Sequence, residues 1–220
     1  MQRLIGRDAE LAEIRAALLD PETRVLRVRG PSGSGKTALV RAAAGTVPDL
    51  IFGERRFPEQ GSGGVAPILG GLALMVERAL DLLYDPRAGA QSLRQVLGGG
   101  LDTLTRAGFA GERDFVGAGS PPTGVANGAA ITEAALIVVR WLTGFGHAAA
   151  LFVDDWQRAP RQAQTLLQAL AREAGCAAFT VLVAERDEAP SSRVDAREIE
   201  LGPLERPHRA QLLGDVTGDP

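Results

Sequence analysis

The sequence predicts a three-layer α/β fold, in which a parallel sheet of five strands is covered on both faces by helices. The first observation is the continuous apolar runs, of which the clearest are 149–155 and 179–185. Strands that are buried on both faces form such runs because they lack the alternation of apolar and polar residues. Helical periodicity between the runs is the second. The third is composition, because 45% of the 220 residues are hydrophobic and 23% are charged, as in ordinary globular domains.

The elements follow one another in a regular order. The spacing of Leu11, Ile14 and Leu18 predicts a helix over 8–19, with Asp8 as its N-cap. Strands are expected at 25–28, 50–57, 149–155, 179–185 and 197–201. Helices are expected at 37–45, 67–83, 92–108 (one broken helix or two short ones), 129–146, 160–175 and from 203 onwards. Glycines and prolines make 110–128 the best candidate for a surface loop.

Charge and cysteine content exclude several classes of protein. The formal net charge is −3 and no run of Lys or Arg occurs, so a nucleic-acid groove is not expected. The single cysteine, Cys176, cannot form an internal disulfide, which favours a reducing cytoplasmic location. The first residues lack the apolar stretch of a signal peptide, and no window reaches the ~20 apolar residues of a membrane span.

The stretch GPSGSGKT, residues 30–37, lies between a predicted strand and a predicted helix and matches the pattern G-x-x-x-x-G-K-[ST] in full. Its glycines allow successive N–H groups to surround phosphate oxygens, and the following helix directs its positive end at the anion. Lys36, the only lysine of the chain, would reach the β- and γ-phosphates, and Thr37 would offer its hydroxyl to Mg²⁺. The alternative is a solvent-exposed Gly/Ser turn, which explains neither the context nor the lysine.

A second candidate site is the acid pair Asp154–Asp155, which ends the apolar run ALFVDD. Mg²⁺ prefers oxygen ligands, and a carboxylate at the end of a buried strand suits it. We expect Asp154 to hold the Mg²⁺ shell and Asp155 to polarise an attacking water. The simpler alternative is that the two acids only end the strand and begin a turn toward Pro160.

Taken together, these stretches resemble the signal-transduction ATPases with numerous domains (STAND), relatives of the AAA+ ATPases, and in particular the ATPase module of large bacterial regulators linked to kinases or LuxR-type transcription factors. The similar stretches are IGRDAELAEIRAAL, VRGPSGSGKTALV, FGERRFPEQ with PILGGLALMVERAL, LFVDDWQRAP, VLVAERDEAP and LGPLERPHRAQLL. The resemblance implies a P-loop NTPase core over 1–202 of the ASCE/AAA+ type, with a helical insert at about 61–145 and the start of a helical lid over 203–220. It also implies that the chain is part of a longer protein.

The resemblance implies further site residues. Ile5, Gly6 and Arg7 would help to bind the adenine base, and Arg186 would sense the γ-phosphate, although a solvated surface arginine is the alternative for Arg186. The nucleotide and metal set expected from motif and resemblance together is Ile5, Gly6, Arg7, Gly30, Pro31, Ser32, Gly33, Ser34, Gly35, Lys36, Thr37, Ala38 and Asp154, with Lys36, Asp155 and Arg186 as catalytic residues.

These features predict a slow ATPase that uses ATP, ADP and Mg²⁺ and acts as a nucleotide-dependent switch in signalling or transcription. Effector domains beyond the lid and a homo-oligomer in the ATP state are the expected partners. The segment 156–160, WQRAP, departs from the Leu-Gln-Trp-Ala-Asp pattern usual in the family, which motivates the alternative of a nucleotide-gated scaffold without hydrolysis. A small-molecule kinase with an acceptor site in 61–128 is the third possibility.

Overall fold

The structure is a computed structural model that describes residues 6–59, 64–110, 127–173, 179–187 and 196–203. Its helices are α1 (Asp8–Leu19), α2 (Lys36–Gly45), α3 (Ala66–Leu82), α4 (Pro86–Leu97), α5 (Gly100–Arg106), α6 (Gly128–Thr143), the short 3₁₀ helix η1 (Trp156–Arg158) and α7 (Arg161–Glu173). Its strands are β1 (Val25–Arg29), β2 (Ile51–Arg56), β3 (Ala149–Asp154), β4 (Phe179–Glu185) and β5 (Arg197–Glu200). Most of 110–128 and nearly all of 203–220 lie outside the described residues.

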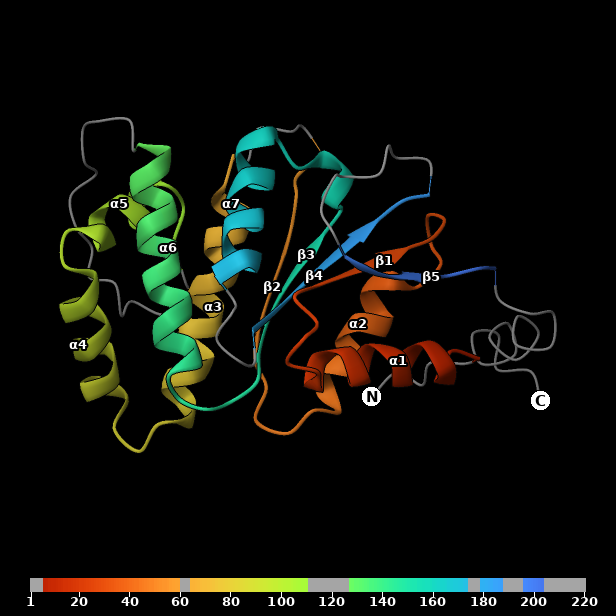
Figure 1. The fold of residues 1–220 in the computed structure, drawn as a ribbon, viewed down its shortest axis with the longest axis horizontal. Coiled ribbons are helices and arrows are strands. Elements are labelled where there is room, and N and C mark those ends of the chain that lie inside the picture. Colours follow the sequence, from red (N-terminus) through yellow and green to blue (C-terminus); the bar gives the residue numbers. More distant parts are fainter. Residues whose placement is uncertain (1–5, 60–63, 111–126, 174–178, 188–195, 204–220) are drawn as a thin grey trace, which may run out of the picture.

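The strands form one parallel sheet in the order β2-β3-β4-β1-β5, so the predicted five-stranded parallel fold is confirmed. Strand β1 lies between β4 and β5, while β3 is separated from β1 by β4. The carboxyl ends of parallel strands meet at one edge of a sheet. The glycine loop after β1 and the acid pair at the end of β3 therefore face the same edge, with the end of β4 between them (Figure 1).

Helices cover both faces of the sheet, which gives three layers (Figure 1). Alternate strand residues such as Leu26, Phe152 and Leu182 pack with α1 and α2 in one cluster. Their neighbours, such as Leu151 and Val181, pack with α3, α4, α6 and α7 in the other. Because side chains of a strand alternate between the faces, each continuous apolar run supplies both clusters.

Two glycines explain how helix α3 lies so close to the sheet. A Cβ on Gly53 would lie 2.2 Å from the carbonyl oxygen of Gly71, and a Cβ on Gly71 would lie 2.4 Å from Leu151 Cδ1. Any larger side chain at these positions would push α3 away from β2 and β3. The glycines inside this predicted helix therefore serve close packing rather than a break in the helix.

The start of α1 corrects one expectation. The N-cap is Arg7, and Asp8 is the first helical residue, where its carboxylate lies in the positive first turn of the helix. The predicted segment 92–108 proves to be two helices, α4 and α5, since Gly98 at φ 49° ends the first of them.

Two arginines in β1, an interior strand of the sheet, pair with acids on its neighbours. Arg27 and Arg29 lie 3.5 and 3.4 Å from Oε1 of Glu185 on β4, and Arg29 lies 3.1 Å from Glu198 on β5. Glu185 is only 1% exposed, and burial raises its pKa against the opposing effect of the two arginines. Paired charges therefore occupy positions of β1 where an apolar residue would be usual.

Candidate functional site

The glycine loop connects β1 to α2 in the geometry that an anion-binding loop needs. Gly33 and Gly35 have φ values of 76° and 89°, in the left-handed region that residues with a side chain rarely adopt. Helix α2 then begins at Lys36, so the first amides of the helix have no partner within it. These amides and the positive end of the helix offer an anion the donors and the charge that it needs.

Gly30, the first residue of the loop, touches the end of β5. A Cβ on Gly30 would lie 2.8 Å from the carbonyl oxygen of Leu201 and 2.9 Å from Ser34 Oγ. The Leu201 amide in turn donates to the Arg29 carbonyl at 2.7 Å. The phosphate loop is therefore fixed directly against the segment that follows β5.

The Lys36 ammonium folds back over its own loop. Nζ donates to the carbonyls of Gly30 and Pro31 at 2.7 and 2.8 Å, and lies 3.5 Å from Ser34 Oγ. Burial lowers the pKa of Lys36, while the nearby Asp187 and Asp154 raise it. A phosphate chain in the loop would offer this ammonium stronger acceptors than two neutral carbonyls.

Asp154 joins the acid strand to the start of α2. Thr37 Oγ1 donates to Asp154 Oδ2 at 2.7 Å, across 117 residues of sequence. The same oxygen accepts from Arg56 at the end of β2, at 2.8 Å from Nη2 and 3.2 Å from Nε. The pKa of Asp154 is lowered because the hydrogen bonds from Thr37 and Arg56 outweigh the opposing effect of burial. Asp154 is thus held as a buried carboxylate, only 4% exposed.

Asp155 lies at the beginning of the turn that leaves the sheet. Its φ of 54° is positive, a conformation that Asp and Asn tolerate better than most residues. Gln157 donates to its Oδ1 at 3.1 Å, and Oδ2 lies 3.5 Å from Arg56 and 3.7 Å from Arg158. Its carboxylate is therefore surrounded by donors at the edge of the site.

The donor set fits a hard cation that binds mainly to phosphate and water. Thr37 and Asp154 supply a hydroxyl and a carboxylate oxygen 2.7 Å apart. Among the described residues, no group of three or more His, Cys, Asp and Glu side chains could hold a metal by itself. Mg²⁺ in nucleotide sites usually needs only one or two protein ligands. The oxygen pair therefore suits Mg²⁺ better than a metal that prefers nitrogen or sulfur.

The structure brings together most of the residues expected from the sequence. Pro31, Ser32, Gly33 and Ala38 are exposed around the loop, and Ser34 to Thr37 are partly buried. Arg186 follows β4 and is partly buried, and its charge is close enough to lower the pKa of Lys36. Ile5 lies outside the described residues, and Gly6 has a positive φ of 68°.

The Arg7 side chain is bound within the protein. The residue is 6% exposed, and its guanidinium contacts Glu10 at 2.7 Å and the carbonyl oxygen of Gly202. The assignment of Ile5, Gly6 and Arg7 to the adenine base stays a prediction.

Sequence reasoning missed Arg56 and Arg158, which flank the acid pair. A signal existed for Arg56, because FGERRF ends in two arginines and Arg56 is the register partner of Asp154. That signal could be used only with the knowledge that β2 and β3 are neighbours. Arg158 lies within the segment that departs from the family pattern.

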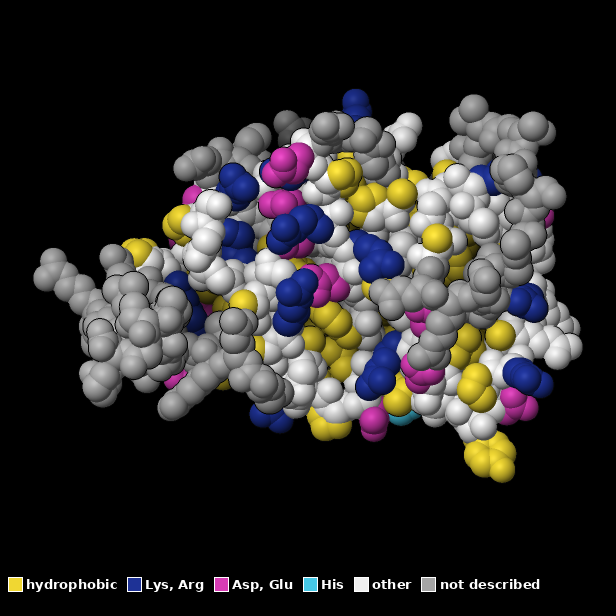
Figure 2. All heavy atoms as spheres, turned by 180° about the vertical axis from the view of Figure 1, so that it is seen from behind, with side chains coloured by type: hydrophobic (Ala, Val, Ile, Leu, Met, Phe, Trp, Pro, Cys, Tyr) yellow, Lys and Arg dark blue, Asp and Glu magenta, His cyan; other side chains and the backbone are white. Residues whose placement is uncertain are grey.

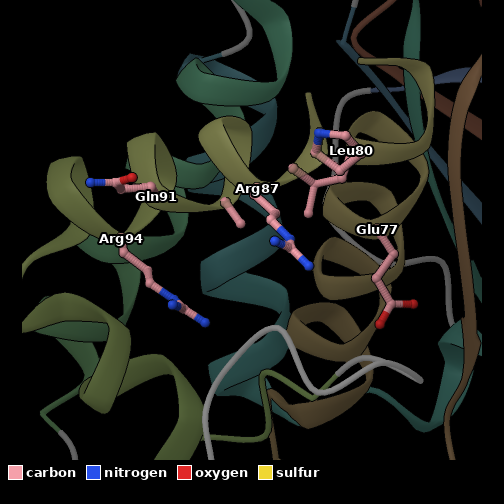
Figure 3. Close-up of a pocket in the computed structure, with 7 residues that line it drawn as sticks. Glu77, Leu80, Arg87, Gln91 and Arg94 are labelled. Carbon is pink, nitrogen blue, oxygen red and sulfur yellow. The ribbon is translucent and has the colours of Figure 1, made fainter. Parts of the chain in front are cut away.

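A cavity of about 680 Å³ lies between α3 and α4, away from this site (Figure 3). It is lined by Glu77, Leu80, Pro86, Arg87, Ala90, Gln91 and Arg94. Helix α4 and the end of β1 lie on opposite sides of the molecule (Figure 1). The cavity therefore has no access to a nucleotide held by the loop.

The surface agrees with the near-neutral composition. Figure 2 shows basic and acidic side chains next to one another across one face of the molecule. Pairs such as Arg41 with Glu54, at 2.7 Å, are of this kind. Within the described part of the chain, no helix is long and apolar enough to cross a membrane.

Comparisons with known proteins agree with this geometry. The family model described as "AAA ATPase domain" matches residues 3–183. A Walker-type ATPase of Pyrococcus abyssi is similar in structure, with a TM-score of 0.54 and 13% identity over 96% of this chain and 57% of that one. A STAND protein with a tetratricopeptide repeat sensor from Pyrococcus horikoshii has a TM-score of 0.45 and 16% identity over 100% of this chain and 26% of that one.

No curated protein matches the chain in sequence. The chain spans just over half of the length of the Pyrococcus abyssi ATPase, 57%. At 13% identity that likeness bears on the fold alone, the parallel sheet with helices on both faces. The family model covers most of the chain, including the glycine loop and the acid pair. The chain therefore belongs to the AAA ATPase domain family.

Proposed function

We propose that this chain binds ATP with Mg²⁺ and hydrolyses it slowly, as the nucleotide-dependent switch of a signalling or transcriptional regulator. The hydrogen bond between Thr37 and Asp154, 2.7 Å long, carries the proposal, because it joins the phosphate loop to the acid pair. A Gly/Ser turn and a strand-ending acid pair without function would have no reason to meet.

The roles follow from position. The amides at the start of α2 bind phosphate oxygens, and Lys36 leaves its own loop carbonyls for the β- and γ-phosphates. Thr37 and Asp154 would hold Mg²⁺, which would neutralise charge on the phosphates when bound. Asp155, beside them, orients the attacking water and accepts its proton. Arg186 lies close enough to Lys36 to stabilise charge that develops on the γ-phosphate.

Slow turnover is supported by the surroundings of Asp155. The Gln157 amide donates to its carboxylate at 3.1 Å, and Arg56 and Arg158 lie within 3.7 Å of it. An amide donor and two cations on the Asp155 carboxylate leave it fewer open acceptor sites, which would slow its action on a water. Nucleotide binding does not depend on this carboxylate.

The finer parts of the proposal rest on the resemblance to regulator modules. They are the division into a core over 1–202 and a lid from 203, effector domains after the lid, association of ATP-bound copies, and a bacterial cytoplasmic setting. Signalling switches of this kind store the nucleotide state in a domain arrangement that attached modules sense.

Calorimetric titration of the purified chain with ATP, with and without Mg²⁺, tests the proposal first. We expect binding that is tighter with Mg²⁺, followed by slow phosphate release in a single-turnover assay. Absence of ATP binding under both conditions would contradict the proposal. ATP binding without any phosphate release would favour the nucleotide-gated scaffold, for which the segment 156–160 is the supporting observation.

A small-molecule kinase is the weakest alternative. The cavity between α3 and α4 would hold an acceptor, but it lies on the far side of the molecule from the phosphate loop. A kinase must bring its acceptor in line with the γ-phosphate.

A further inference from the structure

We propose that the Arg7 side chain does not read the base but holds the segment after β5, Leu201 and Gly202, against the nucleotide site, so that these two residues respond to the nucleotide. The proposal rests on the switch function proposed above and names the part of the core that passes the state on. It concerns a positioning residue, since Arg7 acts through the backbone at Gly202.

The first observation is that the Arg7 side chain is buried and bound to other parts of the protein. It is 7% exposed, its Nη1 donates to Glu10 at 2.7 Å, and its Nη2 donates to the Gly202 carbonyl, 195 residues away. A buried arginine with both terminal nitrogens bound to protein is committed to that place, because removing a charged donor from its acceptors without replacement is costly.

The second observation is what else touches the same two residues. The Leu201 amide donates to the Arg29 carbonyl at 2.7 Å, and Gly30 lies so close to Leu201 that a Cβ would be 2.8 Å from its carbonyl oxygen. The first residue of the glycine loop therefore contacts Leu201, and Arg7 binds the carbonyl of the next residue, Gly202. We call this arrangement the β5 clamp.

The third observation is that Lys36 contacts the loop at this point. It donates to the carbonyls of Gly30 and Pro31, and a bound phosphate would compete with both carbonyls for the ammonium. A change at Gly30 would reach Leu201 through their direct contact, while Arg7 holds the next residue, Gly202. Coupling between the two sites would run through this packed contact.

A second link between α1 and β5 provides a matched control. Glu13 on α1 accepts from Arg197 at the start of β5 at 3.2 Å, but both side chains are more than 40% exposed. Exposed pairs of this kind contribute little. The same two elements are thus joined once by a buried contact at the clamp and once by a surface contact away from it.

Backbone hydrogen exchange of the full chain, with and without saturating Mg–ADP, tests the proposal at the Leu201 and Gly202 amides. We expect Mg–ADP to slow their exchange at least about fivefold in the wild type, the lower end of typical coupling between sites. In Arg7→Ala, saturated with Mg–ADP, this slowing is lost, whereas Glu13→Ala keeps it. Arg7→Lys, which can reach Gly202 but lacks the second donor arm for Glu10, recovers part of it.

The outcomes separate the two proposals. Calorimetry with Mg–ADP is run on every variant, and thermal melting confirms that each is folded. If the wild type binds Mg–ADP but the two amides do not change, or if Arg7→Ala at saturation keeps the full slowing, the clamp is wrong while nucleotide binding stands. If the wild type binds no nucleotide, both proposals fall. If Arg7→Ala does not fold, Arg7→Lys is used for the test. In that variant, full wild-type slowing of amide exchange together with a raised Kd for Mg–ADP would assign Arg7 to the base instead.

Discussion

The phosphate loop and the acid pair face one edge of the sheet, yet their charges are satisfied in opposite ways. Lys36 donates to its own loop, with acceptors only five and six residues away. Asp154 accepts from Thr37 and Arg56, which are 117 and 98 residues away. The loop is therefore a local structure that a short sequence specifies. The acid pair depends on which strands the fold places beside it.

The largest expected effect is the loss of nucleotide affinity in Lys36→Ala, which tests the glycine loop. The substitution removes the cation that would bind the β- and γ-phosphates, and hydrogen bonds to charged groups contribute about 1.5–3 kcal/mol. We expect the Kd for Mg–ATP in calorimetry to rise about 100-fold. The exposed arginine of α1 in Arg15→Ala is the control, for which the Kd should not change. Equal affinity in the wild type and Lys36→Ala would show that the loop is no phosphate site.

In the acid pair, Asp155→Asn distinguishes nucleotide binding from ATP hydrolysis. Asn tolerates the positive φ of 54° at this position, so the turn is retained while the general base is lost. We expect phosphate release at saturating Mg–ATP to fall about 100-fold or more, with an unchanged Kd for the nucleotide. Turnover that survives this change at the wild-type rate would move the general base elsewhere.

Arg56→Ala tests whether Arg56 competes with Mg²⁺ for the Asp154 carboxylate. Arg56 Nη2 lies 2.8 Å from the Asp154 oxygen that Thr37 also contacts, so it occupies the side of the carboxylate that Mg²⁺ would need. The Arg56 side chain is 63% exposed, and such pairs contribute little, so the effect is modest. We expect the Mg²⁺ concentration for half-maximal ATP binding to fall by up to about fivefold.

Arg41→Ala is the matched control for this prediction. Arg41 on α2 is 62% exposed and pairs with Glu54, which lies on β2 as Arg56 does. It makes no hydrogen bond or ion pair with the acid pair. A lower Mg²⁺ requirement in both variants would indicate general surface charge rather than competition at Asp154. A higher requirement in Arg56→Ala would mean that the arginine helps to assemble the metal site.

The smallest expected effect lies on β4, the strand between the two regions. Burial raises the pKa of Glu185 above its usual 4.5, although Arg27 and Arg29 oppose this. The folded chain therefore keeps this proton at pH values where the unfolded chain has lost it. The contribution of Glu185 to stability is complete below about pH 4.5 and is lost as the pH rises through the folded pKa.

Urea unfolding of the wild type and Glu185→Gln at about pH 4 and about pH 7 measures this effect. We expect the difference in unfolding free energy, wild type minus variant, to decrease between the two pH values. Glu198→Gln, at the 42% exposed acid of the same cluster, should show no such decrease. An increase in the difference for Glu185→Gln would mean that the two arginines outweigh burial and that Glu185 is a stabilising carboxylate.

The sequence by itself determined the elements and the chemistry of the loop. Apolar runs and helical spacing are properties of neighbouring residues, so the five strands and most helices of the described chain were predictable within a few residues, whereas α4 begins at Pro86, six residues before the predicted start, and η1 was not predicted. GPSGSGKT specified its own geometry, because positive φ at Gly33 and Gly35 and a helix start at Lys36 are local consequences of that stretch. The acid pair was predictable as a pair for the same reason.

Only the tertiary structure decided which partners these residues have. The order β2-β3-β4-β1-β5 brings Arg56 to Asp154, and the packing of α1 beside β5 brings Arg7 to Gly202. Neither contact can be predicted from the spacing of residues in the sequence. Parallel strands are joined by long crossovers that can place a strand at several positions in a sheet. The resemblance assigned Arg7 to the base, which stays a prediction, and only the tertiary structure shows its buried side chain bound to Glu10 and to Gly202.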